Sequence, residues 1–267
     1  MSQDDLVKEH FHKMGQDGSY AAFYGDRSHK THDFFARKAR VEEFLVSHMR
    51  PGQSVLDVGC GTGPMVDFFC SRGLHYCGLD VAQGMLDSIS RQFSNAPYKE
   101  RIELQIGSSE SIPYPDNSFD LIVGMGLLEY LDDMAPTFSE IARVVKPEGL
   151  AVLTIPNLIS LNRFLMRNAG FITAIYRSWK KLMGAERQPT PGIVHKELAP
   201  SALDGSMKHI GFDCVGRAFY DYKLVCYPVS RLFPKFAHVI NRRIENRAPY
   251  FLANSYIGFY KKQKHSS

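Results

Sequence analysis

Short apolar runs alternate with amphipathic segments over the first 156 residues. The runs cover residues 55–58, 75–79, 101–106, 119–124 and 150–155, and each ends at, or one residue before, glycine, aspartate or proline. The fourth run is nearly continuous, which is typical of a strand buried on both faces of a parallel sheet. Because amphipathic segments of helical period lie between the runs, the pattern predicts a parallel α/β sheet.

The predicted helices cover residues 31–48, 64–71, 84–93, 132–145 and 198–209, where apolar residues recur at helical spacing before a glycine or proline. Residues 1–30 are polar and aromatic without a clean period, and we expect an arm with at most one short helix. Beyond residue 156 we expect an amphipathic helix over 158–182, a loop at 188–192, and strands over 212–220 and 255–261. Residues 224–250 are basic and aromatic.

A glycine-rich loop follows the first apolar run. Residues 59–63 read Gly-Cys-Gly-Thr-Gly, and Pro64 comes next. Glycine lets a ligand approach the bare backbone, and proline suits the first turn of a helix, so we expect strand, tight loop and helix. The third glycine comes one residue too early for the GxGxxG pattern of dinucleotide folds.

Asp80 ends the second run, where a carboxylate can accept two hydrogen bonds from a ribose diol. The carboxyl ends of parallel strands meet at one edge of an open α/β sheet, and ligands bind there. Gly59, Asp80, Gly107 and Gly124 end the first four runs. The sequence therefore predicts a site for a nucleoside-like ligand at this edge.

Composition is ordinary for a globular protein, with 267 residues, 44% hydrophobic and 22% charged. The net charge of +4 is unevenly distributed. Residues 1–156 carry 14 basic and 22 acidic side chains, whereas residues 157–267 carry 18 basic and 6 acidic ones. The basic C-terminal part is either a solvated face or a surface that meets an anionic substrate, carrier or membrane.

Five cysteines without a CxxC pair favour a reducing, cytoplasmic setting over a disulfide scaffold. The polar N-terminus, with Asp4, Asp5 and Glu9, is unlike a secretory signal. We expect no transmembrane helix, because no apolar run reaches about 18 residues. We also expect no nucleic-acid partner.

Four motifs occur in order along the chain. They are residues 55–63, Gly78-Leu79-Asp80, Pro-Asp-Asn-Ser-Phe-Asp at 115–120, and Arg-Val-Val-Lys-Pro-Glu-Gly-Leu at 143–150. In this order and spacing, residues 40–156 resemble the class I S-adenosylmethionine (SAM)-dependent methyltransferases. Leu150 stands where the family has a second glycine. Residues 195–212 are similar to the helix and Gly-Phe turn before the family's sixth strand.

The resemblance implies a Rossmann-like, seven-stranded, mostly parallel sheet with the last strand antiparallel, helices on both faces and a helical lid insertion. We therefore expect an N-terminal arm and helix covering the cofactor site (1–50) and a SAM-binding core (51–156). A helical acceptor lid (157–205) and C-terminal strands that complete the sheet (206–267) would follow.

The resemblance also implies roles for individual residues. The glycine loop and Asp57 would hold the methionine part of SAM, Asp80 the ribose, and the following helix the adenine, while the residues after the fourth strand would form the floor under the sulfonium. Ser108 and Ser109 stand where many members have Asp-Ala. Purely structural roles for Asp57, Gly63 and Met85 stay open. The implied cofactor-binding residues are Asp57, Gly59, Cys60, Gly61, Gly63, Asp80, Val81, Met85, Ser108, Ser109, Gly124, Met125 and Gly126.

The implied reaction is methyl transfer to O, N or C of a small acceptor, anionic or carrier-linked. It needs mainly proximity and orientation, and an oxygen or nitrogen acceptor can also need a general base. The candidate bases are His32, Glu129 and His195, and we favour His195 because it lies where the insertion returns to the core. Arg163 and Arg167 are the candidate ligands of an anionic acceptor. His32, Tyr20 and Tyr24 lie on an arm that could close over SAM.

Three other interpretations stay open. The chain could be a catalytically silent SAM-binding or partner-binding protein on the same fold. It could be a methyltransferase of a lipid-like acceptor at a membrane surface, because residues 158–182 are basic and amphipathic with Trp179. An NAD-dependent oxidoreductase is disfavoured by the early third glycine.

Two further functions are disfavoured by residues 124–130. Gly-Met-Gly-Leu at 124–127 is unlike the motif of amino-methylating DNA enzymes. Gly126 and Tyr130 replace the Glu and His with which ubiquinone-type O-methyltransferases could hold a metal, and we expect no metal ion.

Overall fold

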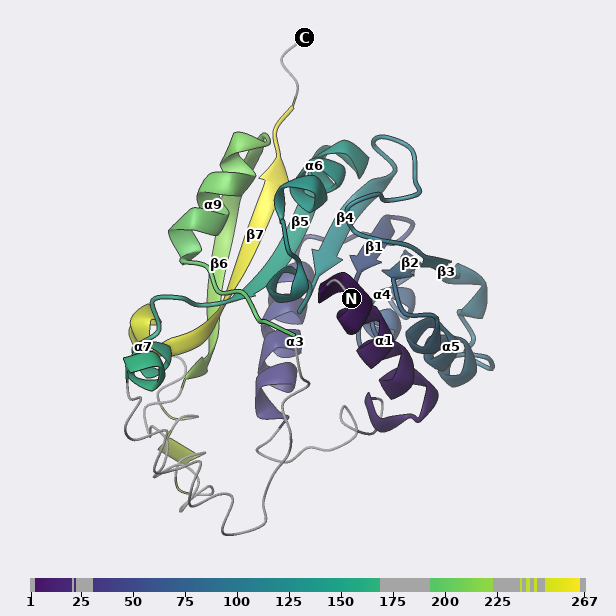
Figure 1. The fold of residues 1–267 in the computed structure, drawn as a ribbon. Coiled ribbons are helices and arrows are strands. Elements are labelled where there is room, and N and C mark those ends of the chain that lie inside the picture. Colours follow the sequence, from purple (N-terminus) through teal and green to yellow (C-terminus); the bar gives the residue numbers. More distant parts are fainter. Residues whose placement is uncertain are drawn as a thin grey trace.

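The computed structural model describes residues 3–20, 22, 31–168, 193–222, 236, 239–240, 243 and 248–264. Within them, seven strands form one sheet in the order β3-β2-β1-β4-β5-β7-β6 (Figure 1). β7 is antiparallel to β5 and β6, and the other pairs are parallel. The strands are β1 (Ser54–Val58), β2 (His75–Asp80), β3 (Ile102–Ile106), β4 (Phe119–Gly124), β5 (Val145–Pro156), β6 (Phe212–Tyr222) and β7 (Ala253–Lys262).

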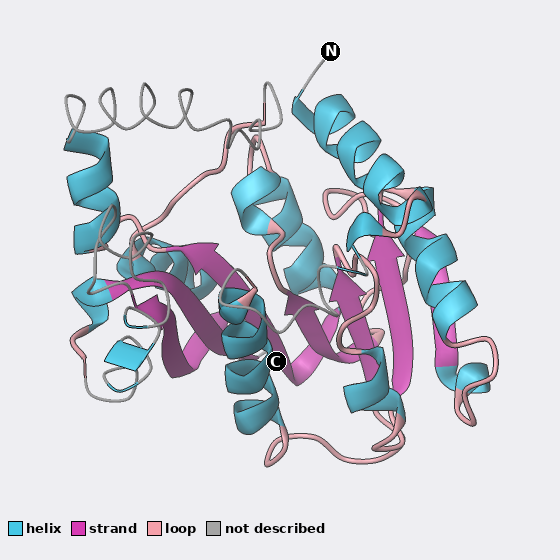
Figure 2. Ribbon diagram, turned by 90° about the horizontal axis from the view of Figure 1, so that it is seen from below, coloured by secondary structure: helices cyan, strands magenta, loops and turns pink. Residues whose placement is uncertain are grey.

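Helices cover both faces of the sheet (Figure 2). α3, α4 and α5 pack on one face, and α6 and α9 on the other. The described helices are α1 (Gln3–Gln16), α3 (His32–Leu45), α4 (Val66–Cys70), α5 (Gln83–Gln92), α6 (Ala135–Val144), α7 (Leu161–Asn168) and α9 (Pro200–His209), with the 3₁₀ turns η1 (Lys99–Arg101), η2 (Leu128–Tyr130) and η3 (Tyr250–Leu252). This architecture confirms the predicted Rossmann-like sheet with an antiparallel last strand.

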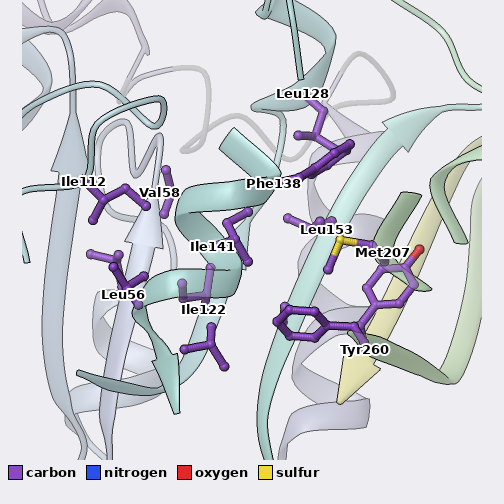
Figure 3. Close-up of a cluster of buried hydrophobic side chains, with 14 of the residues drawn as sticks. Leu56, Val58, Ile112, Ile122, Leu128, Phe138, Ile141, Leu153, Met207 and Tyr260 are labelled. Carbon is purple, nitrogen blue, oxygen red and sulfur yellow. The ribbon is translucent and has the colours of Figure 1, made fainter. Parts of the chain in front are cut away.

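The core on the α6 and α9 face is continuous across the sheet. Figure 3 shows Ile141 of α6 over Leu56 and Ile122 of the central strands, and Met207 of α9 beside Tyr260 of β7. Each of these side chains is fully excluded from solvent, and such burial contributes about 1.5–3 kcal/mol per large apolar side chain. The sheet is therefore a rigid base for the loops at its carboxyl edge.

Two element boundaries differ from the sequence prediction. β5 begins at Val145, five residues early, because Val145 pairs with Phe119 before a register shift brings Leu150 opposite Leu121. α4 begins at Val66, so Pro64 precedes the helix instead of starting it.

The N-terminal arm differs more. α1 is a helix of 14 residues, longer than the short helix expected, and it lies beside α5 and across the edge of the sheet near β1 and β2 (Figure 1). Val7, Phe11 and Met14 are spaced by four and three residues, which is the spacing of one helical face.

The expected insertion is described only at its two ends. α7 and the segment 193–198 lie at the edge of the sheet beside β7, where Asn157 bridges Leu198. The rest of the helix expected over 158–182, the loop expected at 188–192 and most of the basic interval 224–250 lie outside the described residues. The four-part domain division stays a prediction.

Candidate active site

A cavity of about 310 Å³ lies at the carboxyl ends of β1, β2 and β4. The strands reach it because their last residues turn into loops at the same edge, and α1 closes it from the other side. It is lined by Asp5, Val7, Lys8, Phe11, Tyr20, Asp57, Val58, Gly59, Cys60, Gly61, Pro64, Leu79, Asp80, Val81, Met85, Gly107, Ser108, Ser109, Glu110, Met125, Gly126, Leu127, Tyr130 and Leu131.

The glycine loop forms one wall. Gly59 and Gly61 line the cavity with φ of +69° and +53°, a conformation that favours glycine. The backbone N–H groups of Gly59 and Cys60 donate to the carbonyl of Leu79 at 2.8 and 3.2 Å, which ties the loop to β2. Gly63 does not line the cavity, and a Cβ there would lie 2.7 Å from Cγ2 of Val66. Its described role is helix packing.

Asp80 is buried at the end of β2 and faces the glycine loop. Its Oδ2 accepts a hydrogen bond of 2.9 Å from the N–H of Gly61, and its Oδ1 accepts one of 2.9 Å from the N–H of Ala82. Burial raises the pKa of this carboxyl, and the backbone hydrogen bonds oppose that shift. Each carboxylate oxygen has a second lone pair, so Asp80 can still accept bonds from a ligand.

Asp57 lies on the same wall and is also buried. Its Oδ2 accepts a hydrogen bond of 2.9 Å from the hydroxyl of Tyr76. Burial raises the pKa of Asp57 to about 7; the Tyr76 hydrogen bond lowers it, and the nearby Asp80 raises it further. Two buried carboxyls on one wall favour a ligand that carries positive charge.

The far wall is apolar, with hydroxyl groups at its edge. Val81 and Met85 line it where α5 begins. The hydroxyl of Ser108 accepts a hydrogen bond of 3.2 Å from the N–H of Glu110, and the hydroxyl of Ser109 is 2.8 Å from that of Thr137 on α6. Both serines therefore line the cavity with their hydroxyls partly engaged in holding the loop.

The floor comes from the loop after β4. Met125 and Gly126 line the cavity, and the N–H of Gly126 donates to the hydroxyl of Thr154 at 2.9 Å. Gly124 does not line it, because it still belongs to β4, where a Cβ would lie 3.0 Å from Cδ2 of Leu153. Gly124 thus supports the floor from below.

An aromatic roof covers the cavity. The ring of Phe11 on α1 lies edge-on to Tyr20 at 5.8 Å and to Tyr130 at 5.2 Å between centroids, and Tyr130 lies 4.8 Å from His195. Gln3 ties the start of α1 to the same region, because its Nε2 donates to the carbonyls of Tyr130 and Val194 at 3.0 and 3.1 Å. Residues 1–50 were expected to cover the cofactor site, but Phe11 was not singled out; the helical spacing of Val7, Phe11 and Met14 was the available signal.

Residues 56–153 match the model of a family described as a methyltransferase domain. The fold, the glycine loop and Asp80 agree with it. This segment is a methyltransferase domain of the class I SAM-dependent family.

Two proteins of similar sequence are named as methyltransferases. A demethylmenaquinone methyltransferase of Symbiobacterium thermophilum is 37% identical over 111 residues, 40% of this chain and 44% of that protein. A probable SAM-dependent methyltransferase of Mycolicibacterium smegmatis is 27% identical over 173 residues, 61% of this chain and 63% of that protein. The chain thus spans less than two thirds of either relative.

A solved magnesium protoporphyrin IX methyltransferase from Synechocystis PCC 6803 with bound SAH has the same fold. Its TM-score is 0.67 at 14% identity, and the match covers 97% of this chain and 100% of that one. At this identity the likeness shows the fold alone.

The cavity of the methyltransferase domain fits SAM. SAM carries a sulfonium and an ammonium group, and the buried carboxyls of Asp57 and Asp80 provide compensating negative charge. Gly59 and Gly61 have no Cβ, so a ligand can approach the backbone of the loop closely, and Val81 and Met85 supply an apolar wall. Individual contacts with SAM stay predictions.

The preferred base of the sequence analysis, His195, lies beside the cavity and does not line it. Its ring is partly exposed and packs against Tyr130. Burial, followed by the charge of Arg163, lowers the pKa of His195. His32 begins α3 and also does not line the cavity. The predicted arm residue Tyr24 lies outside the described residues.

Arg163 and Arg167 converge on one acid. Nη1 of Arg163 lies 2.6 Å from Oε1 of Glu197, and Nη1 of Arg167 lies 2.5 Å from Oε2 of the same carboxylate. Arg163 also donates to the carbonyl of Asn254 at 3.1 Å. These bonds fasten α7 to the segment 193–198, so both arginines have a described structural role, and a role in acceptor binding stays a prediction.

Neither a metal-binding cluster nor a membrane-spanning helix occurs among the described residues. Among them, no three or more His, Cys, Asp or Glu side chains gather where they could share a metal ion. No helix within the described ranges combines the length and apolar character needed to cross a membrane.

Proposed function

We propose that this chain transfers a methyl group from SAM to a small acceptor. The observation that carries the proposal is the pairing of two buried carboxyls, Asp57 and Asp80, with the positive-φ glycines Gly59 and Gly61 around one cavity in a methyltransferase domain. The arrangement supplies negative charge, open backbone and an apolar wall in one place.

SAM supplies a methyl group on a sulfonium, which is a good leaving group. Asp80 accepts hydrogen bonds from the ribose hydroxyls, and Asp57 faces the ammonium group. Phe11 and Tyr130 exclude water above the cavity, and Met125 and Gly126 set the position of the reacting end. Such positioning accounts for several kcal/mol of the barrier, because it replaces a bimolecular encounter by a fixed geometry.

The acceptor that we infer is small and anionic, free or carrier-linked, and methylated on O, N or C. Lys8 of α1 lines the cavity, and Arg163 and Arg167 share the single carboxylate of Glu197, which leaves one positive charge in excess. Positive charge at both places favours an acceptor that bears a carboxylate or phosphate.

Calorimetry with SAM and a turnover assay with SAM labelled on its methyl carbon test the proposal. We expect SAM binding and transfer of label into a fraction of a metabolite extract. SAM binding without transfer into any fraction would favour a silent SAM-binding protein, and binding of NAD in place of SAM would contradict the cofactor assignment.

A second candidate is methylation of a lipid-like acceptor at a membrane surface. Leu158, Ile159 and Phe164, at the turn before and on α7, are exposed by 39%, 44% and 54%, beside Arg167. An apolar face with a basic neighbour suits an anionic bilayer. Co-sedimentation with anionic and neutral vesicles tests it: binding to anionic vesicles that Phe164→Ser weakens supports this candidate, and absence of binding excludes it.

A further inference from the structure

One carboxylate oxygen of Glu129 is buried and has no role in the site described above. The residue lies in η2, directly after the cavity floor, and its carbonyl accepts a hydrogen bond of 2.8 Å from the N–H of Lys196. Its side-chain Oε2 is buried and has no hydrogen-bond partner among the described residues. A buried acceptor without a partner is unfavourable, and a ligand that donates a hydrogen bond to it would remove this cost.

The surroundings place this oxygen beside the reacting end of the cavity. Gly126, Leu127 and Tyr130, which flank Glu129 in sequence, all line the cavity. The guanidinium of Arg37 from α3 lies against the floor, since a Cβ on Gly126 would be 2.6 Å from its Nη1. Glu129 itself does not line the cavity, so an acceptor contacts its Oε2 only by reaching past Leu127 or Tyr130 on the η2 side.

Charged and titratable groups from three other elements face Glu129. Burial raises the pKa of Glu129, whereas the positive charges of Arg37 on α3 and Arg163 on α7 lower it. Tyr220 of β6 is within electrostatic reach: burial, and to a lesser extent the charge of Glu129, raise its pKa to about 12. A carboxylate held at a raised pKa is a stronger base than an ordinary one.

We propose that Oε2 of Glu129 accepts a hydrogen bond from an O–H or N–H of the acceptor and takes its proton during methyl transfer. This inference rests on the proposed methyltransferase function. The acceptor oxygen or nitrogen forms the new bond to the methyl carbon, and the carbon–sulfur bond breaks with its electron pair on sulfur. The proton moves to Oε2 and leaves Glu129 as a neutral acid, which later releases the proton to water. The acceptor class is thus an alcohol, phenol, acid or amine.

A binding experiment tests the hydrogen bond without turnover. The protein saturated with S-adenosylhomocysteine is titrated calorimetrically with 1-naphthol and with 1-methoxynaphthalene, which share an apolar ring system but differ in the O–H. We expect the wild type to bind 1-naphthol about tenfold more tightly, and Glu129→Met to lose that preference at unchanged S-adenosylhomocysteine affinity. Glu43→Gln, on the exposed side of α3, is the control and should behave as wild type.

The hydrogen bond to Glu129 would be refuted if Glu129→Met and the wild type preferred 1-naphthol over 1-methoxynaphthalene to the same degree. It would also be refuted if the wild type did not bind 1-naphthol. Thermal unfolding excludes a merely structural role. Glu129→Met removes an uncompensated buried oxygen and should keep or raise the Tm, whereas a stabilising ion pair with Arg37 or Arg163 requires a lower Tm.

Turnover tests the proton transfer with the acceptor found under the proposed function. Glu129→Gln keeps the shape but not the base, so kcat should fall about 10²-fold or more, and the loss of rate at low pH should disappear from the profile. An unchanged kcat and an unchanged pH profile in Glu129→Gln would show that Glu129 is not the general base. A wild type that binds SAM without turnover would refute the proposed function, while the naphthol titration would still report on Glu129.

Discussion

Gly15 of α1 and Gly84 of α5 bring their helices into direct backbone contact. A Cβ on Gly15 would lie 2.3 Å from the carbonyl carbon of Gly84, and one on Gly84 would lie 2.4 Å from the carbonyl oxygen of His12. Nδ1 of His12 accepts a hydrogen bond of 3.1 Å from the N–H of Gly84. The roof of the cavity is thus held by a contact that leaves no room for a side chain.

Gly15→Ala should lift α1 from α5 and weaken SAM binding. Because α1 supplies Lys8 and Phe11 to the cavity and no strand to the sheet, we expect affinity to fall about tenfold or more, equivalent to 1.4 kcal/mol, with the Tm of the core little changed. Calorimetry and thermal unfolding measure the two quantities.

Gly205→Ala is the matched control, because a Cβ on this exposed glycine of α9 would meet no atom within 4 Å. It should leave SAM affinity unchanged and stabilise the helix by up to about 1 kcal/mol. Equal SAM affinity in Gly15→Ala and wild type would show that α1 does not control the cofactor site.

The sheet was predictable because its strands are apolar runs that end at, or one residue before, glycine, aspartate or proline. Phe119–Gly124 was placed to the residue, and Asp80 and the glycine loop were placed on one site by the rule that parallel strands end at the same edge. Gly63 and Gly124 belong to the same motifs yet do not line the cavity, since motif membership does not tell which glycines face a ligand and which serve packing.

The aromatic roof and the pairing of Arg163 and Arg167 with Glu197 were not predictable in the same way. Phe11 and Tyr130 lie far apart in sequence, and their contact depends on how α1 packs on α5. Glu197 lies about thirty residues from Arg163 and Arg167, so the sequence showed two cations in an acid-free segment without the carboxylate that folds back onto them. Long-range contacts of this kind follow from tertiary packing.

Asp80→Asn should weaken SAM binding strongly. The substitution removes a charge and one of the acceptor oxygens that hold Gly61 and Ala82, and loss of a charged hydrogen bond costs about 1.5–3 kcal/mol, a decrease of about 10- to 100-fold. Asp120→Asn is the control, because Asp120 lies at the opposite end of the sheet, where it binds Ser54 and Lys146. Unchanged affinity of Asp80→Asn by calorimetry would refute the ribose assignment.

SAM affinity should depend on the protonation of Asp57. The pKa of Asp57 in the free protein is about 7, and a cationic ligand beside it lowers that value, so binding releases a proton. Affinity should be flat above about pH 7 and fall towards tenfold per unit below it. Calorimetry in buffers of different ionisation enthalpy counts the released protons.

Tyr76→Phe sharpens this test. It removes the hydrogen bond that lowers the pKa of Asp57, so the midpoint of the pH dependence should move upward. If the midpoint does not move in Tyr76→Phe, the pH dependence of SAM affinity does not come from the protonation of Asp57. If SAM affinity does not depend on pH at all, Asp57 does not lie close to the positive charge of SAM.

Charge reversal separates the two roles open to Arg163 and Arg167. Arg163→Glu with Arg167→Glu gathers like charges around Glu197, so the Tm should fall and the acceptor KM should rise, while SAM affinity should hold. Glu197→Arg added to these two restores opposite charges with their signs exchanged. We expect the Tm to recover in this triple variant, because the pairing of α7 with residues 193–198 is restored.

The acceptor KM of the triple variant then decides the anionic-acceptor prediction. A carboxylate or phosphate on the acceptor needs the positive sign of the arginines and not only their pairing, so the KM should stay raised although the Tm has recovered. If the KM recovers together with the Tm, the arginines act on the acceptor only by fastening α7, and the positive charge for an anionic acceptor must come from Lys8 on the other wall of the cavity.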